Sequence, residues 1–168
     1  ALQAGILMFN VESWEELERI NAIATDKGTV ADISLRINPD VDPKTHPYVA
    51  TGLKKSKFGM DMSLALEAYQ QAHTMPGVNP VGIDCHIGSQ LTSIDPFLEA
   101  LKRILDYCAR LRDLGLDIRY LDLGGGLGIT YNEEDPPHPR ELGQALTRML
   151  EGTNLTLILE PGRVIAGN

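Results

Sequence analysis

Three short apolar runs in this chain end directly in clusters of glycine and polar residues. The clusters are His86-Ile87-Gly88-Ser89, Gly124-Gly125-Gly126 and Glu160-Pro161-Gly162-Arg163. Parallel strands place their carboxyl ends at one face of a sheet or barrel, and α/β enzymes build their active sites on that face. The sequence therefore predicts a functional site assembled from three strand ends.

The chain alternates apolar runs with amphipathic stretches, which is typical of an α/β fold. The apolar runs are nearly continuous, as in strands that are buried on both faces of a parallel sheet. We expect strands at Ile6–Asn10, Ile33–Asn38, Val81–His86, Ile118–Leu123 and Leu155–Glu160. Because these five strands are too few to close an eight-stranded barrel, the pattern predicts either part of a barrel or an open, doubly wound sheet.

Four helices are expected between these strands. The first begins with the capping box Ser13-Trp14-Glu15-Glu16 and runs to Thr25. A later helix begins at Asp95, interpreted as an N-cap carboxylate, with Pro96 at the first helical position, and stops near Gly115. The remaining two are expected at Ser63–His73 and Pro139–Leu150. The long connections 39–62 and 128–139 are expected to be functional loops.

A length of 168 residues suits about one domain, and no linker divides the chain. The net charge of −8 argues against nucleic acid or an anionic membrane as a partner, since both need a positive face. No apolar stretch approaches the ~18 residues of a membrane span and no leader opens the chain, so we expect a cytoplasmic protein. Cys85 and Cys108 are expected to be buried, reduced thiols, and the abrupt ends of the chain suggest a fragment.

All three clusters contain residues that suit an anion. Consecutive amides at Gly124, Gly125 and Gly126 can form an anion-binding cup, although a tight turn after a strand explains the three glycines equally well. Arg163 would add a fixed cation to the same anion, and Ser89 would add a hydroxyl. The pattern favours a phosphate site, with a purely structural turn as the alternative.

His86 and Glu160 each end an apolar strand, where a polar side chain needs a partner. Asp84 lies two residues before His86 on the same strand face, so a histidine–carboxylate pair is one interpretation. A Glu160 carboxylate would be costly to bury unpaired, and an ion pair with Arg163 or Arg36 would meet that need. Combined with the anion site, these residues instead suit pyridoxal 5′-phosphate (PLP), with His86 facing the ring and Glu160 at the ring nitrogen.

Six short motifs, in this order, resemble those of the fold-type III PLP-dependent decarboxylases. They are Phe9-Asn10-Val11-Glu12-Ser13, Arg36-Ile37-Asn38-Pro39, Ser56-Lys57-Phe58-Gly59, His86-Ile87-Gly88-Ser89-Gln90, Asp122-Leu123-Gly124-Gly125-Gly126-Leu127-Gly128 and Glu160-Pro161-Gly162-Arg163. Each motif alone is modest evidence, but six in the right order are highly specific to this family.

The resemblance implies a role for each matching residue. His86 would stack on the cofactor ring, and Ser89 would hold the phosphate together with the amides of residues 124–126. Glu160 would contact the pyridinium nitrogen. Gly162 would belong to the cofactor site, and Arg163 would bind the phosphate or a substrate carboxylate. No metal is implied.

Members of the family have an eight-stranded (β/α) barrel of the alanine racemase type, followed by a β domain, and act as homodimers that share their active sites. By resemblance, residues 1–168 are a single incomplete PLP-binding domain, about strands four to eight of that barrel, without the β domain. The strand that carries the Schiff-base lysine would precede Ala1. None of the lysines present lies in the family's lysine motif; they are Lys27, Lys44, Lys54, Lys55, Lys57 and Lys102.

Within the family, His86–Gln90 and Gly124–Gly128 are most similar to the members that decarboxylate meso-diaminopimelate to L-lysine. The resemblance implies this activity for the intact protein, with residues 1–168 inactive alone. Alternatives are an ornithine-, arginine- or carboxynorspermidine-type decarboxylase and a non-catalytic PLP- or phosphate-binding relative. Alanine racemases place an arginine at the ring nitrogen, which Glu160 does not match, and a generic sugar-phosphate barrel leaves His86 and Glu160 without a role.

Overall fold

A computed structural model describes residues 1–42 and 58–167 of the chain. Its strands are β1 (Phe9–Val11), β2 (Ala31–Asn38), β3 (Met60–Asp61), β4 (Val78–Asp84), β5 (Tyr120–Asp122) and β6 (Thr156–Ile158). Its helices are η1 (Leu2–Ala4), α1 (Trp14–Asp26), α2 (Met62–Ala72), α3 (Asp95–Asp113), α4 (Pro139–Leu150) and α5 (Arg163–Ala166). The predicted alternation of strands and helices is confirmed, and no described helix is long and apolar enough to cross a membrane.

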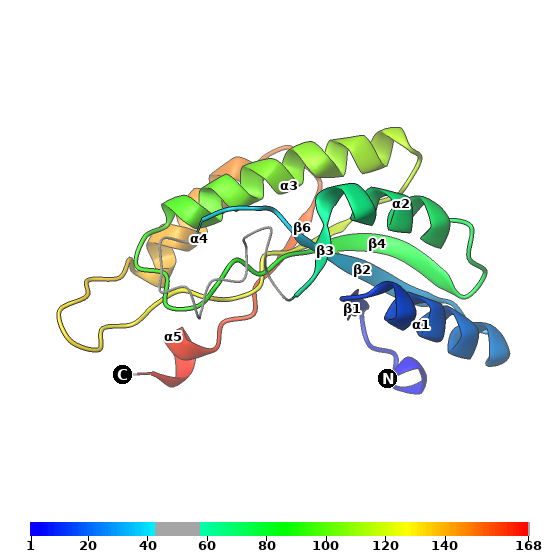
Figure 1. The fold of residues 1–168 in the computed structure, drawn as a ribbon. Coiled ribbons are helices and arrows are strands. Elements are labelled where there is room, and N and C mark those ends of the chain that lie inside the picture. Colours follow the sequence, from blue (N-terminus) through cyan, green and yellow to red (C-terminus); the bar gives the residue numbers. More distant parts are fainter. Residues whose placement is uncertain (43–57, 168) are drawn as a thin grey trace.

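All described strand pairs are parallel, and the sheet order is β1-β2-β4-β5-β6, with the short strand β3 paired to β2. Along this path the strands therefore stand in chain order, as in a (β/α) barrel. In a doubly wound sheet the order of the strands would reverse partway across the sheet. Helices α2 and α3 lie over one face of the sheet, and both chain ends lie on the other side (Figure 1). Of the two expected architectures, the partial barrel is confirmed.

Helix starts follow the predicted capping chemistry in part, because the return bond of the capping box reaches the Glu12 amide instead of the Ser13 amide. The Ser13 hydroxyl accepts from the Glu16 amide at 3.2 Å, while the Glu16 carboxylate accepts from the Glu12 amide at 2.8 Å. The interpretation of Asp95 as the N-cap of α3 is wrong, because Asp95 is already helical and its amide donates to the Ser93 hydroxyl at 3.2 Å. Pro96 is tolerated there because amides of the first turn have no partner within the helix.

Strand β4 begins at Val78, three residues before the predicted Val81, and it includes Pro80. Pro80 has no amide hydrogen, and the register between β2 and β4 shifts beside it, so that Ile33 pairs with Pro80 and Ser34 with Gly82. The buried Tyr69 hydroxyl bridges this irregularity: it donates to the Gly82 carbonyl at 2.7 Å and accepts from the Leu35 amide at 3.2 Å. One side chain of α2 therefore satisfies the backbone where the ladder is disturbed.

The core lies between the sheet and its helices, and it contains Cys85 and Cys108 as free, buried thiols, as predicted. Other strand ends differ from the prediction by up to three residues. The largest difference is at β1, which begins at Phe9 because Ile6 and Leu7 are 46% and 53% exposed and do not join the sheet. Of the two expected functional loops, residues 43–57 of the first lie outside the described residues, together with Lys44, Lys54, Lys55, Lys57 and Ser56.

Candidate active site

The three glycines after β5 form a turn against which two neighbouring strand ends pack. A Cβ atom on Gly125 would lie 2.2 Å from the Glu160 carbonyl oxygen, and one on Gly126 would lie 2.2 Å from the Gly88 carbonyl oxygen. Real Cβ atoms do not approach a backbone oxygen this closely, so both positions require glycine. The turn therefore brings the ends of β4 and β6 together, as the sequence predicted.

The Asp122 carboxylate binds the same glycine turn through a backbone amide. Its Oδ1 accepts from the Gly124 amide at 2.9 Å, and its Oδ2 accepts from the Asn10 side-chain amide at 3.0 Å. Asn10 in turn accepts from the Ser34 hydroxyl, so these side chains link strands β1, β2 and β5. Asp122 and Asn10 thus hold the glycine turn in one conformation.

His86 faces the glycine turn rather than Asp84. Its Nδ1 accepts from the Gly125 amide at 3.2 Å, so the proton of the neutral ring is on Nε2. Burial, followed by the positive charge of Arg36, lowers the pKa of His86, which favours the neutral form. The predicted Asp84–His86 pair is wrong: no hydrogen bond joins the two side chains, and Asp84 Oδ1 has no hydrogen-bond partner.

Two of the three glycine amides are already engaged within the protein. The Gly124 amide donates to Asp122 and the Gly125 amide to His86, whereas no partner is recorded for the Gly126 amide among the described residues. Close packing by itself explains why Gly124, Gly125 and Gly126 are all glycines, as the structural alternative requires. Phosphate binding by the amides of residues 124–126 stays a prediction.

Glu160 lies two residues after the end of β6 and forms no ion pair among residues 1–42 and 58–167. Its amide donates to the Gly124 carbonyl at 2.8 Å, which fixes its backbone against the glycine turn. Neither of the two ion pairs weighed for its carboxylate forms, because Arg36 binds Glu12 at 2.6 Å and Arg163 binds other residues. Glu160 is exposed as a whole residue. The desolvation that its carboxylate does have, followed by the charge of Asp122, raises its pKa, and the charge of Arg36 opposes the shift.

Arg163 and Ser89 meet, as an anion site requires. Arg163 is the first residue of α5, and its Nη2 donates to the Ser89 hydroxyl at 3.1 Å. Its Nη1 donates to the Tyr131 hydroxyl, and its Nε has no hydrogen-bond partner among the described residues. Gly162 caps α5 by accepting from the Ile165 and Ala166 amides at 3.1 Å, and a Cβ at Gly162 would meet no atom within 4 Å.

Asp84 is 4% exposed and lies beside another carboxylate. In the strand register it pairs with Asp122 on one side and with Arg36 on the other. Burial, followed by repulsion from Asp122, raises the pKa of Asp84 to about 8 from an ordinary value of 3.8. Both effects favour the protonated form of Asp84 at neutral pH, against the opposing charge of Arg36.

Replacing Asp84 with asparagine should make the protein more resistant to alkaline pH. A native pKa of about 8 against 3.8 means that the folded protein holds a proton that the unfolded chain releases, so stability falls as the pH rises between those values. We expect Asp84→Asn to raise the free energy of unfolding by about 1 to 3 kcal/mol more at pH 9 than at pH 5. Urea denaturation at both pH values measures this, with Asp117→Asn, whose side chain is 85% exposed, as the control. An equal effect of Asp84→Asn at both pH values would contradict the assignment.

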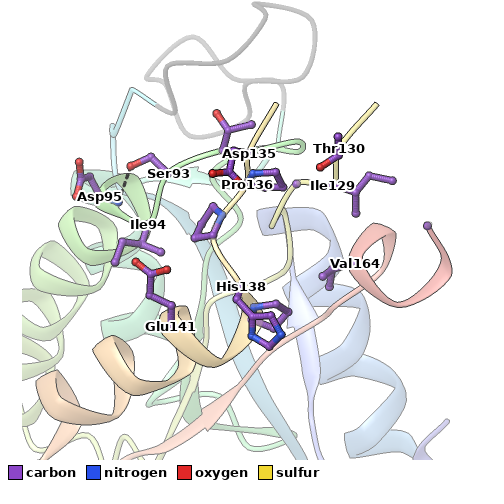
Figure 2. A pocket seen from close by; sticks show the side chains of 15 residues that line it. Ser93, Ile94, Asp95, Ile129, Thr130, Asp135, Pro136, His138, Glu141 and Val164 are labelled. Atoms are coloured by element: carbon purple, nitrogen blue, oxygen red, sulfur yellow. Dashed lines mark hydrogen bonds between the residues drawn. The ribbon is translucent and has the colours of Figure 1, made fainter. Parts of the chain in front are cut away.

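An open cavity of about 1010 Å³ lies beside this site, and its lining includes Gly128 and Val164. Figure 2 shows Ser93, Ile94 and Asp95 from the start of α3, and His138 and Glu141 from the start of α4, around it. The 128–139 loop lines it, but His86 and Glu160 do not. His138 serves as the N-cap of α4, since its Nδ1 accepts from the Arg140 amide at 3.1 Å. Within residues 1–42 and 58–167, no group of His, Cys, Asp and Glu side chains is placed to hold a metal.

Three residues of the site carried no prediction of their own. Asn10 and Asp122 stand in quoted motifs, and an aspartate can accept a hydrogen bond from the backbone amide two residues on, as Asp122 does from Gly124. Tyr131 lies in a polar loop 32 residues before Arg163, and no local pattern indicates that the two meet. Its position depends on the fold of the loop.

A carboxylate that forms no ion pair within the described residues, a histidine bound to the Gly125 amide and a guanidinium–hydroxyl pair are compatible with a cofactor of the pyridoxal type. The comparisons with known proteins agree. Residues 1–167 match the family model of the pyridoxal-dependent decarboxylases, specifically their pyridoxal binding domain. The chain therefore belongs to the pyridoxal-dependent decarboxylase family.

Individual relatives show which members of the family the chain is similar to. The chain is 51% identical to the diaminopimelate decarboxylase of Haemophilus influenzae, over 100% of this chain and 41% of that protein. It is 53% identical to that of Vibrio cholerae, over 100% of this chain and 40% of the relative. The crystal structure of diaminopimelate decarboxylase from Helicobacter pylori complexed with L-lysine matches with a TM-score of 0.93 and 44% identity, over 98% of this chain and 42% of that one. The chain thus spans about two-fifths of the length of these relatives.

Proposed function

We propose that this chain is the cofactor-binding part of a PLP-dependent decarboxylase that converts meso-diaminopimelate to L-lysine and CO₂. The observation that carries the proposal is the Glu160 carboxylate, which lies two residues after β6 beside the glycine turn, is exposed and forms no ion pair within the described residues. Such a carboxylate suits a cationic ring nitrogen. Arg163 lies three residues further along the chain, and its bond to Ser89, in the segment that follows β4, suits a phosphate.

Each residue has a stated part in this site. When bound, PLP supplies an electron sink for the electrons released as the bond between the substrate Cα and its carboxylate breaks. Glu160 would hold a proton on the ring nitrogen, and neutral His86 would pack against the ring face. Arg163 and Ser89 would bind the phosphate, and Asp122 would keep the glycine turn in place beneath it.

The choice of substrate rests on the relatives. Both named relatives at 51% and 53% identity are diaminopimelate decarboxylases, and the Helicobacter pylori enzyme was crystallised with L-lysine. L-Lysine is the product that meso-diaminopimelate yields when it loses one carboxylate. We also propose that the full-length protein acts in the cytoplasm and that it is a homodimer. Sedimentation of the purified protein tests the oligomeric state.

The test is an assay of the full-length protein with added PLP. We expect CO₂ release and L-lysine formation from meso-diaminopimelate, with ornithine and arginine turned over at least about 100-fold less efficiently, since a site built for one polar group rejects analogues that lack it. Release of CO₂ from ornithine or arginine in preference would favour the corresponding alternative. PLP binding without turnover of any amino acid would favour the non-catalytic relative.

Residues 1–168 alone should not catalyse the reaction. Lys27 caps the carboxyl end of α1 and Lys102 lies within α3, so neither described lysine lies among the strand ends of the site. We expect that the isolated chain with PLP releases CO₂ from meso-diaminopimelate no faster than PLP alone. The full-length protein is the positive control, and a rate above that of free PLP from residues 1–168 would overturn this expectation.

A further inference from the structure

The loop between β5 and α4 is held at two points before it reaches the site. The Gln90 side chain binds the Ile129 backbone twice: its Nε2 donates to the Ile129 carbonyl at 2.6 Å, and its Oε1 accepts from the Ile129 amide at 3.2 Å. Gln90 itself has a left-handed backbone with φ 60°, which a residue other than glycine adopts at a cost. This double hydrogen bond fixes where the loop leaves the sheet.

The second point is a turn closed by Glu134. Its carboxylate accepts from the Tyr131 amide at 3.0 Å and from the Asn132 amide at 2.7 Å, and its carbonyl accepts from the Thr130 hydroxyl at 3.0 Å. Hydrogen bonds from the backbone, that of Asn132 first, lower the pKa of Glu134 and keep it ionised. The turn therefore presents Tyr131 in a defined direction.

Tyr131 contacts Arg163 in two ways. Its hydroxyl accepts a hydrogen bond from Arg163 Nη1, and the guanidinium carbon lies 5.5 Å from the centre of its ring. Ser89 binds the other terminal nitrogen at 3.1 Å, so the guanidinium is held from both sides. Tyr131 is 57% exposed, which means that core packing does not explain its position.

We propose that Tyr131 is a positioning residue that, with Ser89, holds the Arg163 guanidinium ready for an oxyanion, either the cofactor phosphate or a substrate carboxylate. This inference rests on the proposed function, because that function assigns an anion to Arg163. A free arginine side chain samples many rotamers, and binding an anion must restrict them. Holding the guanidinium in advance removes that cost from the binding step.

The test uses the full-length protein and three variants. Tyr131→Leu removes both the ring and the hydroxyl, Tyr131→Phe keeps the ring over the guanidinium, and Glu133→Ala changes a neighbouring loop residue as the control. We expect Tyr131→Leu to weaken one anion contact about tenfold and Tyr131→Phe roughly threefold, since the phenylalanine keeps the cation–π contact. Glu133→Ala should leave both constants within about twofold, and thermal unfolding should show that all variants remain folded.

Two readouts separate the sources of the anion. A rise in the PLP Kd, measured by fluorescence without turnover, indicates that Arg163 binds the phosphate. A rise in the KM for the amino acid at saturating PLP, with kcat within about threefold, indicates a substrate carboxylate. If Tyr131→Leu changes neither constant by more than Glu133→Ala does, the inference is wrong while the proposed function stands. If the wild type neither binds PLP nor releases CO₂, the proposed function is wrong and the inference falls with it.

Discussion

Replacing Glu160 with glutamine should lower kcat of the full-length enzyme by roughly two to three decades. The amide keeps the shape of the side chain and one hydrogen bond, but it loses the negative charge that would keep a proton on the ring nitrogen. Each ~1.4 kcal/mol of lost transition-state stabilisation costs about tenfold, so a loss of a few kcal/mol gives this range. Steady-state kinetics with saturating PLP measures the effect.

The PLP Kd of Glu160→Gln should change much less than kcat. The substitution does not alter Arg163 or Ser89, which bind each other at 3.1 Å and form the proposed anion site. Glu151→Gln, at the carboxyl end of α4, provides a control in which a carboxylate outside the site is lost. Near-normal turnover by Glu160→Gln would assign Glu160 a structural role only and would remove the main support for the proposed function.

Gly125→Ala should destabilise the protein by about 3 kcal/mol or more. The new methyl group would lie 2.2 Å from the Glu160 carbonyl oxygen, and backbone on both sides would have to move to admit it. Overpacking of this kind costs typically 1–3 kcal/mol, and roughly more where the obstacle is backbone rather than a flexible side chain. Because the Gly125 amide also binds His86, the same movement should displace the histidine and weaken PLP binding.

Gly143→Ala is the matched control for this prediction. Gly143 lies within α4, and a Cβ there would meet no atom within 4 Å. Alanine favours a helix over glycine by about 1 kcal/mol, so this variant should be as stable as the wild type or more so. Urea unfolding of both variants gives the comparison. If Gly125→Ala is no less stable than Gly143→Ala, the tight packing at the glycine turn is not real.

The existence and order of the main elements were predictable from the sequence, because buried strands and amphipathic helices leave strong patterns. Strand limits were less accurate where tertiary contacts override local pattern. Pro80 argues against a central strand, yet β4 includes it, since the register shift removes the need for its amide and Tyr69 binds the neighbouring backbone. Ile6 and Leu7 show the reverse case, as apolar residues that do not join a strand.

The site was predictable to the extent that its residues end strands. The meeting of Ser89 with Arg163 was expected, since both follow strands of one parallel sheet. The partners of individual atoms were not, because they depend on distances that no spacing encodes. His86 binds the Gly125 amide rather than Asp84, Arg36 binds Glu12 rather than Glu160, and neither choice has a local signal.

The strand order also bears on how the sheet can assemble. Strand β2 pairs with β1, β4 with β2, β5 with β4 and β6 with β5, so each strand in the sheet order finds its partner in the strand already made before it. The entropic cost of closing a loop grows only slowly with its length, and here each pairing closes one crossover at a time. This order allows the sheet to grow strand by strand in the direction of synthesis. The hydrogen bond from Asn10 to Asp122, 112 residues apart, is then a long-range contact that ties β1 to β5 across the strands between them.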